Sequence, residues 1–108
     1  MKRFGRMSTL REGAEGEYDR LHAAVWPEVL AAIQRAGIRN YSIFRNGRQL
    51  FSYFEIPDDI GLEDVTRVML AEPACRRWED VMQTLQQPPV DGAGAAWWTP
   101  MKEIFHSP

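Results

Sequence analysis

Residues 38–56 read IRNYSIFRNGRQLFSYFEI and carry the clearest strand signal in the chain. Two runs rich in aromatic and β-branched residues, 38–46 and 48–56, lie on either side of Asn46-Gly47. Such residues favour strands, and an Asn-Gly pair between two strand-like runs is typical of a tight β-hairpin. Pro57 is expected to end the second strand. The stretch therefore predicts two neighbouring antiparallel strands.

A long helical pattern precedes this hairpin. In residues 14–36 apolar side chains recur at steps of three and four, and Gly37 follows as the expected C-terminal stop. Pro27 interrupts the pattern, because it lacks a backbone donor and disfavours helical geometry at the preceding Trp26. We therefore expect a kink or a short break there, with Pro27 opening a second helical segment.

The rest of the chain supplies the other elements. Phe4, Met7 and Leu10 are candidate inward residues of an N-terminal strand, and Pro100 places the start of a C-terminal strand at a sheet edge or a bulge. These remaining elements are a strand over 2–10, helices over 62–71 and 73–85, a loop over 86–96 and a last strand over 97–106.

The resulting order is β-α-β-β-α-β, the split arrangement of a ferredoxin-like α+β fold. We expect one domain over residues 1–108, with an antiparallel sheet and helices on one face. Such a sheet leaves its other face bare. Because many apolar and aromatic side chains must lie on that face, we expect a second copy to cover it in a homodimer.

Composition argues against nucleic-acid-binding, membrane-spanning and cysteine-rich proteins. The formal net charge of −2 gives no field that would steer a nucleic acid, so no nucleic-acid partner is expected. No apolar stretch approaches the length of a membrane span, and no membrane association is expected. Cys75 is the single cysteine, which excludes an internal disulfide and a cysteine-rich zinc site. We interpret the chain as cytoplasmic.

Tyr18 and His22 are the first candidates for chemistry. They lie four residues apart and share one helix face, where a phenol and an imidazole can both exchange protons with a polar ligand. The alternative is a pair at the edge of the core with satisfied hydrogen bonds. Tyr41 points to the opposite face from Asn40; it lines a cavity if it faces the bare side of the sheet, and otherwise packs in the core.

Tryptophan supplies further candidates. Trp78 and Glu79 lie on the last helix, and aromatic faces stack on the apolar faces of sugars. The alternative is that at least two residues of the set Trp78, Glu79, Trp97 and Trp98 belong to the core or to a dimer interface. Glu28 follows Trp26-Pro27 and is either a surface charge in a first helical turn or a support of the site.

The motifs that the chain lacks also restrict its chemistry. The sequence holds no G-x-G-x-x-G, no P-loop lysine pattern and no G-x-S-x-G. His22 and His106 are the only histidines, and with Cys75 they form no spaced metal motif. We therefore expect no metal and no cofactor, but proton transfer by histidine, tyrosine and carboxylate groups in an aromatic pocket.

At this point the sequence resembles a known family, the L-rhamnose mutarotases, over almost the whole chain. The Tyr-x3-His-x3-Trp-Pro-Glu block is the most specific part of the likeness. The residues that carry it are Glu17-Tyr18, His22, Trp26-Pro27-Glu28, Gly37, Asn40-Tyr41, Cys75-Arg76-Arg77-Trp78 and Phe105. The resemblance implies a dimeric α+β barrel that interconverts the α and β anomers of a free deoxy-sugar without a cofactor.

The resemblance also implies residue roles. His22 matches the family's proton donor, expected to act at the ring oxygen, and Tyr18 and Tyr41 match its substrate-binding tyrosines. Trp78 matches the first member of a Trp-Trp pair that walls the sugar, whereas the second member is Glu79 here. This departure replaces a flat apolar wall by a carboxylate and bears on which sugar is bound.

Several readings stay open beside this one. The region around Trp78-Glu79 also looks similar to an L-fucose mutarotase-like branch, while Asn40-Tyr41 favours L-rhamnose. His106 is either a second site group or a surface residue, and the general base is Glu79, Glu28 or a water molecule. Alternatives of other classes are a dimeric α+β barrel monooxygenase or heme-binding protein, and a non-catalytic sugar-binding dimer.

Overall fold

The predicted hairpin is present in the computed structural model, which describes residues 1–88 and 97–108. Strands β2 (Arg39–Asn46) and β3 (Gln49–Ile56) pair antiparallel, with Asn46 opposite Gln49. Gly47 occupies the first position of the two-residue loop with a φ of +60°, a conformation that glycine adopts without steric cost. The hairpin is confirmed, although Asn46 closes the strand instead of lying in the loop.

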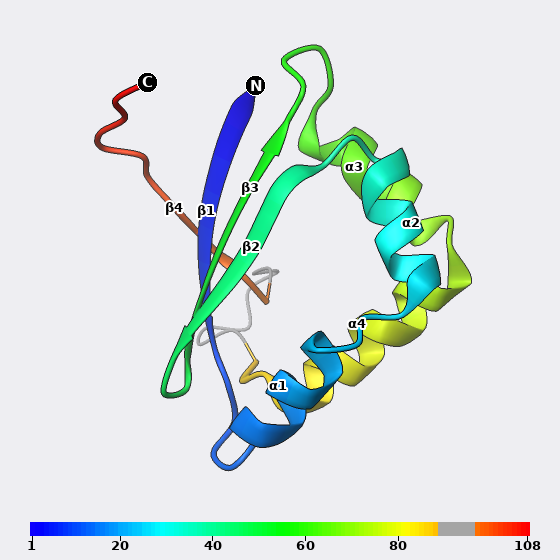
Figure 1. Cartoon of the computed structure of the whole chain (residues 1–108), viewed down its shortest axis with the longest axis vertical. Helices are drawn as coiled ribbons and strands as arrows, with labels where there is room; N and C mark the ends of the chain where they lie inside the picture. The colour runs from blue at the N-terminus through cyan, green and yellow to red at the C-terminus, as the bar shows by residue number, and fades with distance from the viewer. Residues whose placement is uncertain (89–96) are drawn as a thin grey trace.

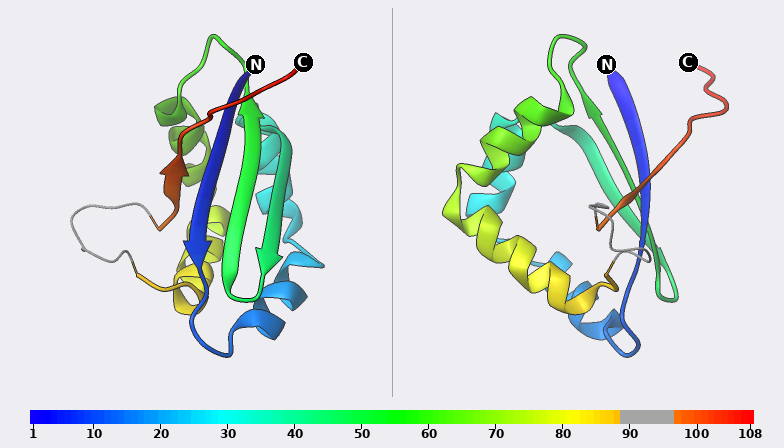
Figure 2. Two further views of the ribbon diagram at one scale, coloured as in Figure 1. Left: turned by 90° about the vertical axis from the view of Figure 1, so that its left-hand side faces the viewer. Right: turned by 180° about the vertical axis from the view of Figure 1, so that it is seen from behind.

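The sheet has four strands in the order β2-β3-β1-β4, and every neighbouring pair is antiparallel. Strand β1 (Lys2–Thr9) lies between β3 and the short edge strand β4 (Thr99–Met101). All helices lie on one side of this sheet, and the other side is uncovered (Figures 1 and 2). The strand order and the helix placement confirm the ferredoxin-like α+β prediction.

The first helical region is divided, as Pro27 predicts. Helix α1 (Glu15–His22) ends before Ala23, and helix α2 (Pro27–Arg35) begins at the proline itself. Trp26 has an extended ψ of 134°, which is the conformation that a following proline favours. The missing donor of Pro27 falls at a position of α2 that needs none, so the proline opens this helix without the loss of a helical hydrogen bond.

Two further helices complete the layer on the covered face. Helix α3 (Leu62–Leu70) begins where the Asp64 carboxylate accepts a hydrogen bond from the Gly61 amide at 2.9 Å. Helix α4 (Pro73–Leu85) coincides with its predicted range. Within residues 1–88 and 97–108, no helix is long and apolar enough to cross a bilayer.

The core between the sheet and the helices falls into two groups of buried side chains. One group surrounds Trp78 of α4, and the other surrounds Phe54 of β3. Their fully buried members, which lose all contact with solvent, are Leu10, Ala32, Leu50 and Ile56. Removing such side chains from water supplies the main stabilisation of the layer contact.

The N-terminal strand differs from its prediction at Met7. Phe4, Ser8 and Leu10 face the helices, and Met7 lies opposite Phe51 on the outer face. Side chains alternate strictly along a strand, so Met7 cannot share a face with Phe4 and Leu10. Its expected inward position was wrong.

The C-terminal strand is much shorter than the predicted range 97–106. Only Thr99–Met101 pairs with β1, and residues 102–108 leave the sheet as an extended segment (Figure 2). Pro100 does lie on an edge strand, where its missing donor costs no ladder bond. The predicted loop over 86–96 begins at Gln86, which bridges to Leu10, and its residues 89–96 lie outside the described ranges.

We predict that Gly37→Ala destabilises the protein by about 1–2 kcal/mol. Gly37 has a φ of +87°, and an added Cβ would lie 3.2 Å from the Cδ1 atom of Ile60. Gly16→Ala is the matched control, because that glycine is helical and an added Cβ meets nothing within 4 Å. Urea unfolding should show a loss for the first variant and a small gain for the second. Equal stability of the two variants would contradict the conclusion that the backbone conformation at Gly37 requires glycine.

Candidate active site

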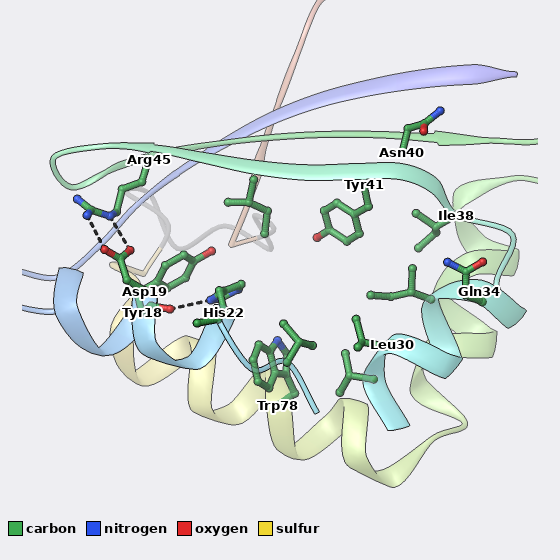
Figure 3. Close-up of a pocket in the computed structure, with 15 residues that line it drawn as sticks. Tyr18, Asp19, His22, Leu30, Gln34, Ile38, Asn40, Tyr41, Arg45 and Trp78 are labelled. Carbon is green, nitrogen blue, oxygen red and sulfur yellow. Dashed lines mark hydrogen bonds and ion pairs between the residues drawn. The ribbon is translucent and has the colours of Figure 1, made fainter. Parts of the chain in front are cut away.

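A cavity lies between the inner face of the sheet and the helix layer. It has two adjoining parts of about 620 Å³ and about 490 Å³, within the range of roughly 300–1,000 Å³ that small-molecule sites occupy. Four chemically distinctive residues line both parts: Tyr18, His22, Tyr41 and Trp78 (Figure 3). The residues that the sequence singled out from α1, β2 and α4 therefore meet in one hollow.

His22 is held in a defined orientation at the end of α1. Its Nδ1 lies 2.9 Å from the backbone carbonyl oxygen of Tyr18 (Figure 3). A carbonyl can only accept, so Nδ1 carries the proton in this contact. In the neutral ring Nε2 is then a free acceptor, and this half-buried imidazole can take a proton from a ligand in the cavity.

Aromatic rings surround this imidazole. The Tyr18 ring stacks on His22 with 4.0 Å between ring centroids, and Trp78 meets it edge-on at 5.3 Å. Trp26 packs edge-on against Trp78 at 5.0 Å between centroids. Trp26 thus supports the wall that Trp78 presents to the cavity.

The limited access of water shifts the proton affinities of these groups. Burial lowers the pKa of His22, although its bond to the Tyr18 carbonyl and the charge of Asp19 oppose this effect. Burial also raises the pKa of the Tyr18 and Tyr41 hydroxyls. Near neutral pH the imidazole is therefore mostly an acceptor, and both phenols are protonated donors.

Tyr41 reaches the cavity because of a bulge in β2. The register with β3 shifts between Arg39 and Ser42, and Asn40 takes a φ of +52° that asparagine tolerates better than most residues. The Asn40 amide donates to Glu55 at 2.6 Å, and Tyr41 points to the helix side. The cavity therefore lies on the covered face, whereas a cavity-lining Tyr41 was expected to face the bare side.

The other predicted site residues lie in different places. Glu79 lines the cavity from α4, where its side chain is exposed at the mouth and loss of solvation raises the pKa of its carboxyl. Glu28 is exposed in the first turn of α2, and His106 is exposed in the C-terminal segment. Neither residue is among those that line the cavity within the described ranges. The structure thus does not bring Glu28 and His106 to the site.

Sequence reasoning missed an ion pair that borders the same cavity. The Arg45 guanidinium donates to the two Asp19 carboxylate oxygens at 2.8 and 2.6 Å (Figure 3). This pair joins β2 to α1 beside His22, and the hydrogen bonds from Arg45, together with its charge, lower the pKa of Asp19. Alternation from Tyr41 through Ile43 could have placed Arg45 on the inner face.

A second missed residue is Arg6 of β1, which lines the cavity opposite the helices. It follows the inward Phe4 by two positions, which is the signal that could have found it. Within residues 1–88 and 97–108, no group of three His, Cys, Asp or Glu side chains is placed to hold a metal ion. The expectation of cofactor-free chemistry stays a prediction.

Comparison with known proteins identifies the family. A family model described as L-rhamnose mutarotase matches residues 3–107. The chain belongs to the L-rhamnose mutarotase family. Its relatives include the L-rhamnose mutarotase of Lactiplantibacillus plantarum, 32% identical over 98% of both chains, and that of Bacillus subtilis, 33% identical over 98% of both. Membership makes the chain an isomerase-type enzyme that acts on sugar anomers.

A solved structure of this family shares the fold. The crystal structure of an L-rhamnose mutarotase from Formosa agariphila superposes with a TM-score of 0.76 at 22% identity, and the match covers 100% of each chain. This likeness supports the ferredoxin-like architecture of the whole chain. Family membership also confirms the resemblance that the Tyr18, His22 and Trp26-Pro27-Glu28 block indicated.

We predict that the His22 imidazole titrates below pH 6.5 in the folded protein, because burial disfavours its charged form. A pH titration of the histidine ring signals by NMR measures this pKa. His106→Gln removes the second histidine signal and assigns the remaining one to His22. A His22 pKa at or above 6.5 would show that the ring is better solvated or more strongly paired than the cavity geometry indicates.

Proposed function

We propose that this enzyme accelerates the interconversion of the α and β pyranose anomers of L-rhamnose, with His22 as its proton-transfer group. The sugar is the one named for its relatives. The observation that carries the residue assignment is the His22 ring, which lines the cavity and whose Nδ1 is bound to the Tyr18 carbonyl, while Nε2 has no hydrogen-bond partner among the described residues. Proton transfer by such a group is the chemistry that anomer exchange requires.

Anomer exchange opens the pyranose, turns the aldehyde and closes the ring again. In the proposed mechanism, Nε2 of neutral His22 accepts the proton of the anomeric hydroxyl while the bond between C1 and the ring oxygen breaks. The imidazolium then gives this proton to the ring oxygen, which becomes the C5 hydroxyl of the open aldehyde. Closure on the other face of the aldehyde reverses both transfers, so protons and electrons balance over the cycle.

Other lining residues hold the sugar in this scheme. The protonated Tyr18 and Tyr41 hydroxyls donate hydrogen bonds to sugar oxygens, and the Trp78 ring packs against an apolar face of the pyranose. Glu79 accepts from a hydroxyl at the cavity mouth. Glu28 is exposed outside the cavity, so we do not assign it as the general base.

The family match favours this reading over the two alternatives of other classes, the monooxygenase or heme-binding protein and the non-catalytic sugar-binding dimer. L-Fucose stays an alternative substrate, to be compared directly with L-rhamnose. The expected cytoplasmic location and the absence of a nucleic-acid or membrane partner also stay predictions.

We predict that His22→Ala lowers the enzyme-dependent rate of L-rhamnose anomer exchange by about 10²–10⁴-fold, because it removes the proton-transfer group. Saturation-transfer NMR at anomeric equilibrium measures this rate. Arg20→Ala is a control on the same helix, since Arg20 is exposed and pairs only with Glu17 among the described residues. An unchanged exchange rate in folded His22→Ala would refute the assignment of His22.

We also propose that the enzyme is a homodimer that covers the bare sheet face. Phe44 of β2 is 65% exposed, and its cross-strand partner Phe51 and the edge residue Met101 are exposed as well. Ile104 and Phe105 extend this apolar surface into the C-terminal segment. Exposed apolar side chains gathered in this way mark interaction sites, and a second copy would bury them.

We predict that Phe44→Glu shifts the protein from a dimer, of twice 12.5 kDa, towards a monomer. A charge within the apolar face must be desolvated on association, which disfavours the dimer. Light scattering after size exclusion measures the mass. Ala31→Glu on the exposed side of α2 is the control and should leave the dimer intact. The proposed interface is wrong if Phe44→Glu stays a dimer, or if Ala31→Glu is a monomer as well. It is also wrong if the unmodified protein is a monomer at micromolar concentration.

A further inference from the structure

One charged side chain in the cavity has no role in the scheme above. Arg6 of β1 projects from the inner face of the sheet, and its guanidinium carbon lies 4.8 Å from the Phe54 ring centroid and 5.6 Å from that of Trp98. These aromatic faces hold the guanidinium plane by cation–π contact. Its Nε is buried and has no hydrogen-bond partner among the described residues.

A second unpartnered polar group lies beside it. Ser52 of β3 is the cross-strand partner of Arg6, and its buried Oγ has no hydrogen-bond partner within the described ranges either. A buried polar group left without a partner costs roughly 1–3 kcal/mol. Of the two residues, Arg6 is the one that lines the cavity, so its Nε marks a place where a ligand can supply the missing partner.

Glu79 faces this part of the cavity from the helix side. Arg6, Tyr41 and Glu79 line the same part of the cavity, and Arg6 lies close enough to the Tyr41 hydroxyl to oppose, by its charge and by hydrogen bonding, the rise of the Tyr41 pKa that burial causes. Yet in residues 1–88 and 97–108 Arg6 and Glu79 are not within ion-pair distance of each other. A donor and an acceptor thus face one cavity without satisfying each other directly.

Their position relative to His22 matters for substrate choice. Arg6 and Glu79 line only one part of the cavity, whereas Asp19 and Arg45 line only the other. His22 lies between the two parts, and Trp78, which meets His22 edge-on, directly precedes Glu79 in α4. A pyranose with its ring oxygen at His22 can therefore present the substituent on its neighbouring C5 to Arg6 and Glu79.

L-Rhamnose carries a methyl group on C5, which offers these polar side chains nothing. A hydroxymethyl group in its place supplies a hydroxyl, which accepts from a guanidinium and donates to a carboxylate at the same time. We propose that Arg6, with Glu79, is a specificity-determining residue that favours an L-aldohexose with a 6-hydroxyl over its 6-deoxy counterpart. This inference rests on the proposed anomer exchange and concerns only which sugar the same site prefers.

The test compares L-mannose with L-rhamnose, which differ only by the 6-hydroxyl. Exchange efficiency (kcat/KM) for each sugar gives a preference ratio, which should exceed one in the unmodified enzyme. Arg6→Met fills the apolar space beside Phe54 and Trp98 without the donors, and is expected to lower the ratio at least tenfold. Glu79→Gln should lower it less, because the amide keeps an acceptor oxygen.

Arg3→Met is the matched control, because Arg3 lies on the same strand but on the outer face, bound to Glu103 at 2.8 Å. It should leave the ratio unchanged. A ratio at or below one in the unmodified enzyme, or an equal ratio in Arg6→Met and Arg3→Met, would overturn the inference while leaving the proposed function intact.

If neither sugar shows accelerated exchange, a binding measurement still tests hydroxyl selection by Arg6 separately from the proposed catalysis. The proposed function then fails, and the ratio of dissociation constants, read from tryptophan fluorescence on adding each sugar, decides the inference alone. A tenfold fall of that ratio in Arg6→Met supports hydroxyl selection by Arg6. An unchanged ratio, or no binding of either sugar, rejects it.

Discussion

The hydrogen bond between His22 Nδ1 and the Tyr18 carbonyl is the contact on which the account of the site depends. It spans one helical turn and fixes both the tautomer and the tilt of the imidazole. It lies at the C-terminal end of α1, which stops at His22 before α2 begins at Pro27. The contact thus leaves Nε2 as the nitrogen of the neutral ring that can accept a proton.

The walls of the cavity come from elements that are far apart in the chain. Tyr18 and His22 belong to α1, Tyr41 to β2, and Trp78 to α4 (Figure 3). Stacking joins the rings of Tyr18 and His22, and an edge contact joins His22 to Trp78. Helices α1 and α4 therefore hold each other's aromatic side chains in place. The same rings limit the access of water, which lowers the pKa of His22 and leaves its imidazole neutral at the start of the proposed reaction.

Local signals predicted much of this arrangement. The hairpin needed only Asn46-Gly47 between two strand-like runs, and the helix break needed only Pro27, because both are decided by backbone chemistry. The C-terminal strand was overestimated, since strand length beyond Met101 depends on a partner that residues 102–108 lack within the described chain. The likeness to a family supplied His22, Tyr18, Tyr41 and Trp78 as site residues, and the structure places all four around one cavity.

What the sequence could not supply is the side of the sheet on which the cavity lies. Tyr41 was expected to line a cavity only on the bare face, yet the bulge at Asn40 turns it towards the helices. Arg6 and Arg45 were not predicted as site residues, because charged residues in strands usually face solvent. Their inward positions follow from alternation only after the inner face has been assigned.

The most direct test of the central claim is an intermolecular NOE spectrum of the isotope-labelled enzyme with unlabelled L-rhamnose. The account predicts contacts from the anomeric proton of the sugar to the His22 ring, with further contacts to Trp78 and Tyr41. Contacts confined to the outer sheet face, for example to Phe44, with none to His22 would contradict it.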